Sequence, residues 1–230
     1  EYGRYDDAGR LYRQALHINR RWFGDNRVET ASNLTLLGRA LVKEDRNDEA
    51  ADVLRQALAI QERVYGPAHP QVASTLNEMG SVALSGKRLD DAEAAYRRML
   101  EIYRKVYGDN HYLIAVAMSN LSTVAMRRGS YAEAERMMHE VVARFTSSLS
   151  PEHLNTGIAR IKLGRTLAKQ QKWSGVAEES RAGYDILVKQ NSQQQAFLKM
   201  AREDLGVAYA ALGDSANAKR FTVELADRRG

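Results

Sequence analysis

Three histidines recur at a fixed interval and are the first candidates for chemistry. His69, His111 and His153 lie 42 residues apart, and imidazole nitrogens are common zinc ligands. One zinc ion needs its ligands about 2 Å away, whereas equivalent positions of successive structural repeats lie much farther apart. We therefore assign the histidines to the starts of three helices and expect no metal site.

The stretch GSVALSGKR, from Gly80 to Arg88, approaches a phosphate-binding P-loop. Five residues separate its glycines where the P-loop has four, and Arg88 stands where a Ser or Thr would hold magnesium. No strand is predicted before it, as a P-loop requires. The chain also lacks cysteine, an HExxH motif and a nucleophile elbow. We expect no catalytic residue, no cofactor and no enzymatic activity.

Composition limits the compartment and the kind of partner. The longest apolar run, Leu113 to Met118, is far shorter than the roughly 18 residues of a membrane span. The absence of cysteine fits a reducing compartment, so we expect a cytoplasmic protein without membrane contact. The 34 basic and 29 acidic side chains give a net charge of +5. Both signs are interleaved along the chain, which does not favour nucleic acid as a partner.

A strict repeat of 42 residues organises the chain and must position any functional residue. It runs without insertion through columns of similar residues. The columns are Phe23, Tyr65, Tyr107, Leu149 and Asn191; Leu37, Met79, Leu121, Leu163 and Leu205; Gly38, Gly80, Ser122, Gly164 and Gly206; and Ala8, Ala50, Ala92, Ala134, Val176 and Ala218.

Each repeat predicts two helices. In one unit Val72, Leu76, Met79, Gly80 and Ala83 share one face of a helix, here termed helix A, and Ala92, Tyr96, Met99, Leu100 and Tyr103 share one face of a following helix B. A turn over residues 85–88 separates them. Gly24, Gly66 and Gly108 are placed to take a left-handed conformation after helix B, and Pro70 suits the first turn of helix A.

Glycine in the middle of helix A costs about 1 kcal/mol relative to alanine, so its recurrence needs a packing reason. Small residues at these positions, together with the alanine column of helix B, allow neighbouring helices to approach closely. Each helical hairpin then buries its remaining apolar face on the next, which predicts a solenoid.

These columns resemble the tetratricopeptide repeat. Leu76, Met79-Gly80, Leu89 and Ala92 match its pattern in one unit, and Met118, Leu121, Tyr131 and Ala134 match it in the next. The 42-residue period and the wording YGPAHPQVASTLNEMG resemble the kinesin-light-chain type of that repeat. The resemblance implies an all-α fold, an α-α superhelix formed as a right-handed solenoid of antiparallel helix pairs. Arg160 and Arg202 depart from it, because a large apolar residue is expected there.

The repeat also predicts the domain organisation. We expect a single solenoid domain over residues 1–230, in which residues 1–22 are helix B of a truncated repeat and residues 23–64, 65–106, 107–148, 149–190 and 191–230 are the repeats. Because the chain starts inside a repeat, we expect it to be a fragment of a larger protein with other domains.

The candidate binding site follows from the geometry of a solenoid, whose A helices line the concave face. Side chains beside the buried stripe of helix A form a groove of small polar and basic groups. The residues are Thr35, Arg39, Lys43, Asn77, Ser81, Ser119, Asn120, Thr123, Arg127, Arg165 and Lys169. Amides can hold an extended peptide backbone, and arginine can pair with carboxylates.

These residues predict a non-catalytic protein-interaction scaffold that binds a partner protein or peptide, and the basic groove residues favour an acidic one. Two alternatives stay open. One is a regulatory segment of a larger signalling protein such as a bacterial serine/threonine kinase. The other is an RNA-binding helical solenoid, although the period exceeds the roughly 34–35 residues of base-reading repeats and the groove lacks a stacking aromatic in each unit.

Overall fold

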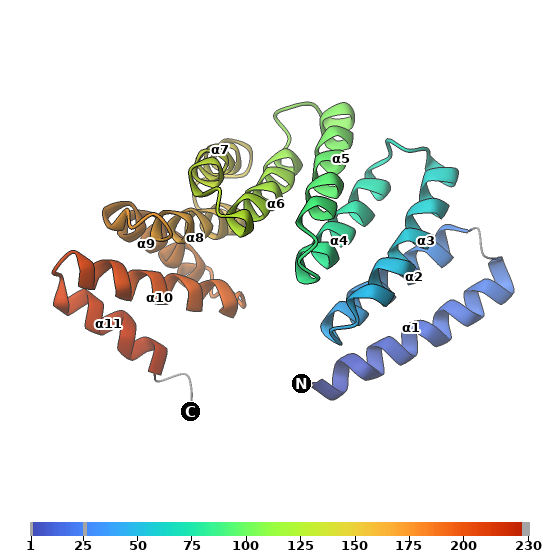
Figure 1. Cartoon of the computed structure of the whole chain (residues 1–230), viewed down its shortest axis with the longest axis horizontal. Coiled ribbons are helices and arrows are strands. Elements are labelled where there is room, and N and C mark those ends of the chain that lie inside the picture. The colour runs from blue at the N-terminus through green and yellow to red at the C-terminus, as the bar shows by residue number, and fades with distance from the viewer. Residues whose placement is uncertain (1, 25–26, 227–230) are drawn as a thin grey trace. The chain divides into compact units, whose positions relative to one another are not determined.

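The computed structural model describes residues 2–24 and 27–226, which form helices and turns without a strand (Figure 1). The A helices are α2 (Val28–Lys43), α4 (Pro70–Ser85), α6 (Tyr112–Arg128), α8 (Leu154–Ala168) and α10 (Gln195–Ala211). The B helices are α1 (Tyr2–Phe23), α3 (Asn47–Tyr65), α5 (Leu89–Tyr107), α7 (Tyr131–Ser148), α9 (Trp173–Lys189) and α11 (Ser215–Ala226). The all-α expectation is confirmed, and each A helix packs against the B helix that follows it.

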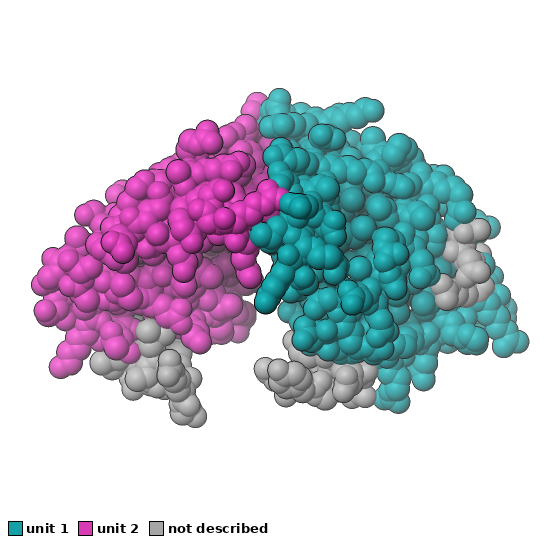
Figure 2. All heavy atoms as spheres, viewed as in Figure 1, with its two compact units in different colours: residues 1–109 teal, residues 110–230 magenta. Residues whose placement is uncertain are grey.

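The chain forms two compact units, residues 1–109 and residues 110–230 (Figure 2). Unit 1 holds α1 to α5 and unit 2 holds α6 to α11. The expectation of one domain with those repeat boundaries stays a prediction, as does the expectation about the chain ends. The final residues 227–230 and the side chain of Tyr5 lie outside what the structure describes.

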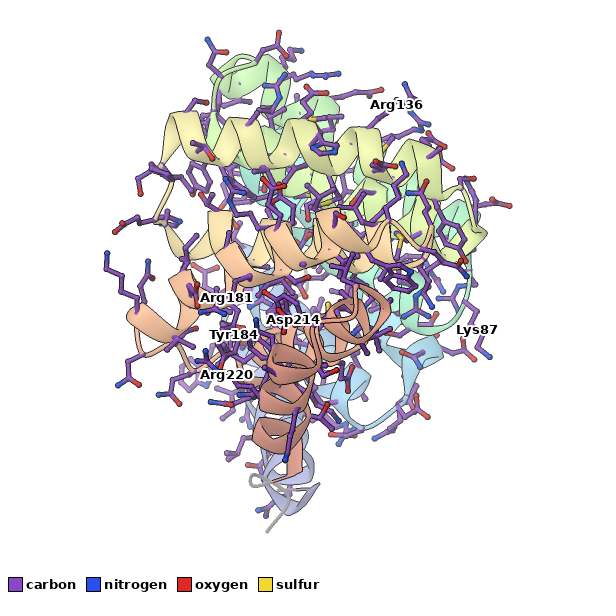
Figure 3. The ribbon with its side chains drawn as sticks, turned by 90° about the vertical axis from the view of Figure 1, so that its left-hand side faces the viewer. Lys87, Arg136, Arg181, Tyr184, Asp214 and Arg220 are labelled. Carbon is purple, nitrogen blue, oxygen red and sulfur yellow. The ribbon has the colours of Figure 1, made fainter. Side chains whose placement is uncertain are left out.

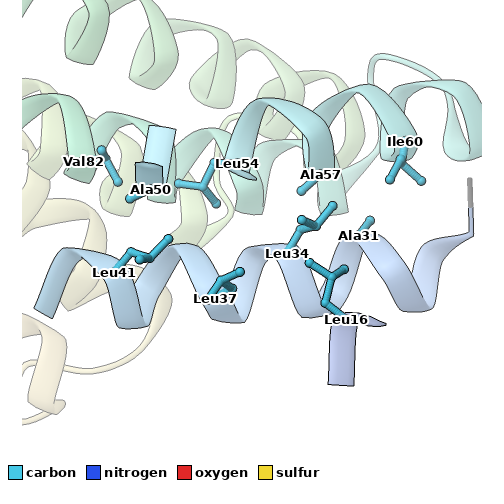
Figure 4. Packing of buried hydrophobic residues seen from close by; sticks show 10 residues of the cluster. All are labelled: Leu16, Ala31, Leu34, Leu37, Leu41, Ala50, Leu54, Ala57, Ile60 and Val82. Carbon is cyan, nitrogen blue, oxygen red and sulfur yellow. The ribbon is translucent and has the colours of Figure 1, made fainter. Parts of the chain in front are cut away.

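Each unit is built around side chains from both helix types. In unit 1 the apolar face of α2, with Leu34, Leu37 and Leu41, packs against Leu54 and Ile60 of α3 (Figure 4). The corresponding core of unit 2 joins residues of α8, α9, α10 and α11, and its largest fully buried side chain is Phe221. The predicted stripes therefore face the core, where burial of each large side chain contributes roughly 1.5–3 kcal/mol.

Gly24, Gly66 and Gly108 have positive φ angles, as expected, but Gly66 and Gly108 do not adopt the left-handed helical conformation. Gly66 has φ 85° and ψ 159°, and Gly108 has φ 75° and ψ 173°. These angles lie in an extended region that essentially only glycine adopts. The prediction of a left-handed helical residue was wrong here, because the chain must leave helix B in an extended direction before the next helix A.

Asn191, with φ 48°, is left-handed after α9, but the other left-handed residues lie in the turns from helix A to helix B and recur every 42 residues. They are Asp45, Lys87, Gly129, Gln171 and Gly213, with φ between 57° and 82°. The residue after each one donates its backbone N–H to a carbonyl five positions earlier, as in Arg88 to Ala83 at 2.8 Å. This is the Schellman arrangement. Sequence reasoning missed it because three of the five residues are not glycine.

Gly38 and Gly80, in the middle of helix A, each lie against a large side chain of the following helix B. A Cβ at Gly80 would lie 2.5 Å from Cε1 of Tyr96, and one at Gly38 would lie 2.8 Å from Cγ of Leu54. Close packing is confirmed, but the partner is not the alanine column. It lies four residues later, at Leu54, Tyr96, Met138, Ser180 and Thr222.

We expect Gly80→Ala to destabilise the chain by about 1–3 kcal/mol, because Tyr96 is buried and cannot move away from the new methyl group. Gly206→Ala is the matched control. Its Cβ would meet only Oγ1 of Thr222 at 3.4 Å, so the gain in helix propensity, up to about 1 kcal/mol, should dominate. Urea unfolding of both variants measures the difference, and equal effects would contradict this packing role.

Candidate functional site

The three histidines cap helices, as the sequence predicts. The Nδ1 atom of His69 accepts the N–H of Gln71 at 3.2 Å, and His153 accepts that of Asn155 at 3.1 Å. His111 makes the equivalent bond at 3.3 Å. Each histidine satisfies one of the backbone donors that a helix start leaves unpaired. Among the described residues no group of side chains is arranged to hold a metal ion.

The predicted binding residues of unit 1 lie on α2 and α4, and together they are called the A surface of unit 1. Arg39, Lys43 and Ser81 line a pocket of about 250 Å³ between the two helices, together with Glu78. The guanidinium of Arg39 pairs with Oε1 of Glu78 at 2.8 Å. The other two predicted residues of unit 1, Thr35 and Asn77, do not line this pocket.

The hydroxyl of Thr35 donates to the carbonyl of Ala31 at 3.0 Å, so this donor is already paired within α2. Asn77 is half-buried on α4, beside Glu78, and does not line the pocket. The structure therefore brings together three of the five residues predicted in unit 1.

The A surface of unit 2 consists of the predicted residues on α6 and α8. Ser119 and Asn120 line a pocket of about 140 Å³, whose other walls include Phe145 of α7 and Ile158 and Lys162 of α8. Lys162 donates to Oγ of Ser119 at 3.0 Å. The remaining predicted residues lie outside this pocket.

Thr123 bonds the carbonyl of Ser119 within its own helix, and Arg127 and Lys169 are exposed near the ends of α6 and α8. Arg165 is already engaged inside unit 2. Its Nε lies 2.8 Å from Oδ2 of Asp204, and its Nη2 lies 3.1 Å from Oε2 of Glu203.

Burial raises the pKa of Asp204 to about 6, although the charge of Arg165 and its hydrogen bond act in the opposite direction. An external carboxylate would therefore have to compete with two internal ones for Arg165.

The ion pairs Arg39–Glu78 and Arg165–Asp204 occupy the same two repeat positions, three repeats apart. Within unit 2 the pair of positions between α6 and α8 carries Thr123 and Lys162 instead. Lys162 is thus a cation at the position where α4 carries Glu78 and α10 carries Asp204. No carboxylate of the described chain pairs with it, and burial lowers its pKa.

Sequence reasoning named Asn120 but missed the column to which it belongs. That column is Leu36, Glu78, Asn120, Lys162 and Asp204. Glu78, Lys162 and Asp204 each contact the preceding helix A, through Arg39, Ser119 and Arg165 respectively. The 42-residue spacing alone would have identified Lys162 as the member with the opposite charge.

The two arginines at apolar positions are accommodated by neighbouring side chains. Arg160 pairs with Glu179 at 2.7 Å, and Arg202 is buried with its guanidinium 5.9 Å from the ring centre of Tyr184. Tyr184 also contacts Phe221, near Arg181 and Arg220 (Figure 3). The aliphatic stems and planar guanidinium groups of Arg160 and Arg202 supply apolar contact in place of a large hydrophobic residue.

The other motifs have structural positions. Tyr131 and Trp173 are half-buried at the starts of α7 and α9, as expected for packing under the turn. The stretch Gly80 to Arg88 covers the end of α4 and the turn, and Lys87 is its left-handed residue. No described helix is long and apolar enough to cross a membrane.

Helical hairpins that recur at a constant period define the class of helical repeat proteins, to which this chain belongs. A model of the tetratricopeptide repeat matches residues 3–63, 40–105, 71–125 and 113–175. The chain belongs to the tetratricopeptide repeat family. No curated protein matches it.

Several solved structures share the fold. BtubC (BKLC) from P. vanneervenii is 16% identical, with 98% of this chain and 91% of that chain covered and a TM-score of 0.81. A Podosopora anserina protein of kinesin-light-chain type, with nearly identical TPR-like repeats, is 20% identical over 84% of this chain and 90% of that one, with a TM-score of 0.67. A Rap protein complexed with Competence and Sporulation Factor is 18% identical over 99% and 60%, with a TM-score of 0.74.

The helix cap at His153 can be tested by substitution. We expect His153→Ala to lower the free energy of unfolding by about 0.5–2 kcal/mol, because the N–H of Asn155 loses its acceptor. His153→Asn should keep most of the stability, since asparagine is a preferred cap. Thermal unfolding distinguishes the two variants, and equal losses would show that capping is not the role of this histidine.

Asp204 should make stability depend on pH. Its pKa is 3.8 ordinarily and about 6 in the folded chain, so the folded chain holds more protons between these values. The free energy of unfolding should therefore fall by up to about 3 kcal/mol as pH rises through this window. Subtracting the curve of Asp204→Asn from that of the wild type isolates this contribution in urea unfolding from pH 4 to 7.

A difference that stays constant or increases with pH would exclude this role for Asp204. Arg165→Met is the companion variant. Loss of the guanidinium removes the group that favours the charged carboxylate, so the decline should extend to higher pH than in the wild type.

Proposed function

We propose that the chain is a protein-interaction scaffold whose A surfaces bind a peptide segment of a partner, and that Lys162 is the anchoring cation for an acidic group of that peptide. Membership of the tetratricopeptide repeat family supports the scaffold role. The Rap structure, complexed with Competence and Sporulation Factor, supports the capacity of this fold to hold a second molecule.

The observation that carries the proposal is the charge at Lys162. Its ammonium is desolvated and has a hydroxyl, that of Ser119, as its hydrogen-bond partner at 3.0 Å. Lys162 is half-buried, and a cation that has lost part of its hydration is costly without an anion, whereas a paired one regains much of that cost. A carboxylate entering the pocket would supply the missing charge.

The walls of the same pocket suit the rest of a peptide. Asn120 and Asn155 carry amides that can donate to and accept from a peptide backbone. Val116, Phe145 and Ile158 give an apolar patch beside them. An acidic residue with an apolar neighbour in an extended segment therefore fits best. Arg127 and Lys169, exposed at helix ends, add positive charge that steers such a segment.

The test uses displayed random peptides of about 12 residues, selected on the wild-type chain and then synthesised. We expect the selected sequences to share an Asp or Glu. Lys162→Met should weaken their binding by about 2–5 kcal/mol, because the carboxylate loses a desolvated partner. The same variant should unfold at higher urea concentration than the wild type, since a half-buried charge without a carboxylate partner is replaced by an apolar side chain.

Lys105→Met, an exposed lysine of α5 in unit 1, is the control and should bind as the wild type does. Selected peptides without acidic residues, or unchanged binding by Lys162→Met, would exclude Lys162 as the anchor.

A further inference from the structure

A separate groove lies on the B-helix side of unit 1 and is called the outer groove. It encloses about 690 Å³ between α3 and α5. Its floor is formed by Leu76, Met79 and Ala83 of α4, and its walls include Ala51 and Leu58 of α3 and Ala95 of α5. The residues predicted for binding are not part of its lining.

Small residues at three repeat positions create the outer groove. Ala83 stands where the preceding repeat has Leu41, and Ala95 stands where the neighbouring repeats have Val53 and Met137. Ala94 replaces the charged side chains that the other repeats carry at its position. The missing side-chain volume leaves a hollow between α3 and α5 in which Met79 and Leu58 are partly exposed, while Leu76 and Ala83 remain buried.

The rim of the outer groove has opposite charges at its two ends. Near the starts of α3 and α5, the carboxylates of Asp48 and Asp91 both lie 3.3 Å from the guanidinium of Arg88. The carboxylate of Asp48 is 98% exposed and that of Asp91 is 69% exposed, so both can meet a further cation. The other end carries two guanidinium groups.

Arg55 and Arg98 lie at this second end, and Arg55 is 64% exposed. Arg55 pairs with Asp52, and Arg98 pairs with Glu62. Because the Arg55–Asp52 pair is exposed, Arg55 can exchange Asp52 for a carboxylate of a ligand at little cost in free energy. A ligand with a basic group at one end and an acidic group at the other therefore complements the rim.

We propose that the outer groove is a docking site for a short amphipathic helix of a partner protein, with an apolar stripe, a basic residue at one end and an acidic residue at the other. From residue 48 to residue 58, α3 extends about 15 Å, which corresponds to about three helical turns. An apolar stripe at i, i+4 and i+7 covers this length.

The chemistry of the walls selects a helix over an extended segment. The backbone groups of α3 and α5 are bonded within their own helices, so the groove offers no ladder of donors and acceptors. An extended segment lying on Leu76 and Met79 would bury unpaired backbone groups, which is costly. A helix satisfies its own backbone and presents only side chains to the floor.

This site is independent of the proposed peptide site, because it uses α3 and α5 of unit 1 and not Lys162. The test uses synthetic helical peptides of about 12 residues with leucines at i, i+4 and i+7. One series has Lys at the first turn and Glu at the last, and a second series has the reverse order. A third peptide has the same composition with its leucines scattered around the helix.

The blocking variants are Ala94→Arg and Ala51→Glu, which introduce the residue types that equivalent positions carry at Arg136 and Glu135. Ala143→Arg, at an exposed position of α7 in unit 2, is the matched control. We expect one charge order to bind, and each blocking variant to weaken binding at least tenfold in fluorescence anisotropy. The control should stay within twofold, and circular dichroism should show equal helicity for all variants.

Several outcomes would overturn the proposal. These are binding by neither charge order, equal binding by the scattered peptide, and wild-type affinity in both blocking variants. A chain that self-associates in sedimentation, and does so only without Ala94→Arg, would show that a second copy occupies the outer groove. That result would equally refute a separate partner helix.

Discussion

The close approach of helix A to helix B is the constraint on which the other features depend. At Gly38 and Gly80 the backbone of helix A lies directly under Leu54 and Tyr96, with no space for a Cβ. Because Leu54 and Tyr96 need a small residue of helix A beneath them, these contacts fix the register of the hairpins α2–α3 and α4–α5. Register then decides which residues of helix A turn away from helix B, and so it determines the A surface.

On the A surface, one pair of repeat positions holds an ion pair at two places and a lysine without a carboxylate partner at a third. Arg39–Glu78 and Arg165–Asp204 join successive A helices through the same two positions. Between α6 and α8 the same positions hold Thr123 and Lys162, and the lysine is left with a hydroxyl partner. A departure from the repeat, rather than the repeat itself, thus marks the candidate anchor.

Much of the fold could be predicted from the sequence, because it is local and repeated. The helix stripes, the mid-helix glycines and the capping histidines each follow from spacing within a single repeat. The left-handed turn residues were missed since Lys87 and Gln171 give no glycine signal, and the extended exit at Gly66 depends on where the next helix lies. Features that depend on contacts between different repeats were harder to predict.

Lys162 was missed as a candidate because its state depends on distances between helices. The sequence shows a lysine beside Ile161. It does not show that the ammonium of this lysine reaches Ser119, or that no carboxylate of the described residues pairs with it. Similarly, the outer groove arises from alanines on different helices, whose missing volumes combine only in the folded unit. Such sites require the packing of the helices to be known first.

The pKa of the Lys162 ammonium, followed by NMR with and without a selected acidic peptide, tests the anchoring role most directly. In the free chain this pKa should lie below the ordinary value of 10.5, because the group is desolvated. Binding of a carboxylate should raise it, and the ammonium signal should persist to higher pH. A peptide that binds while the pKa of Lys162 stays unchanged would contradict the assignment of Lys162 as the anchor.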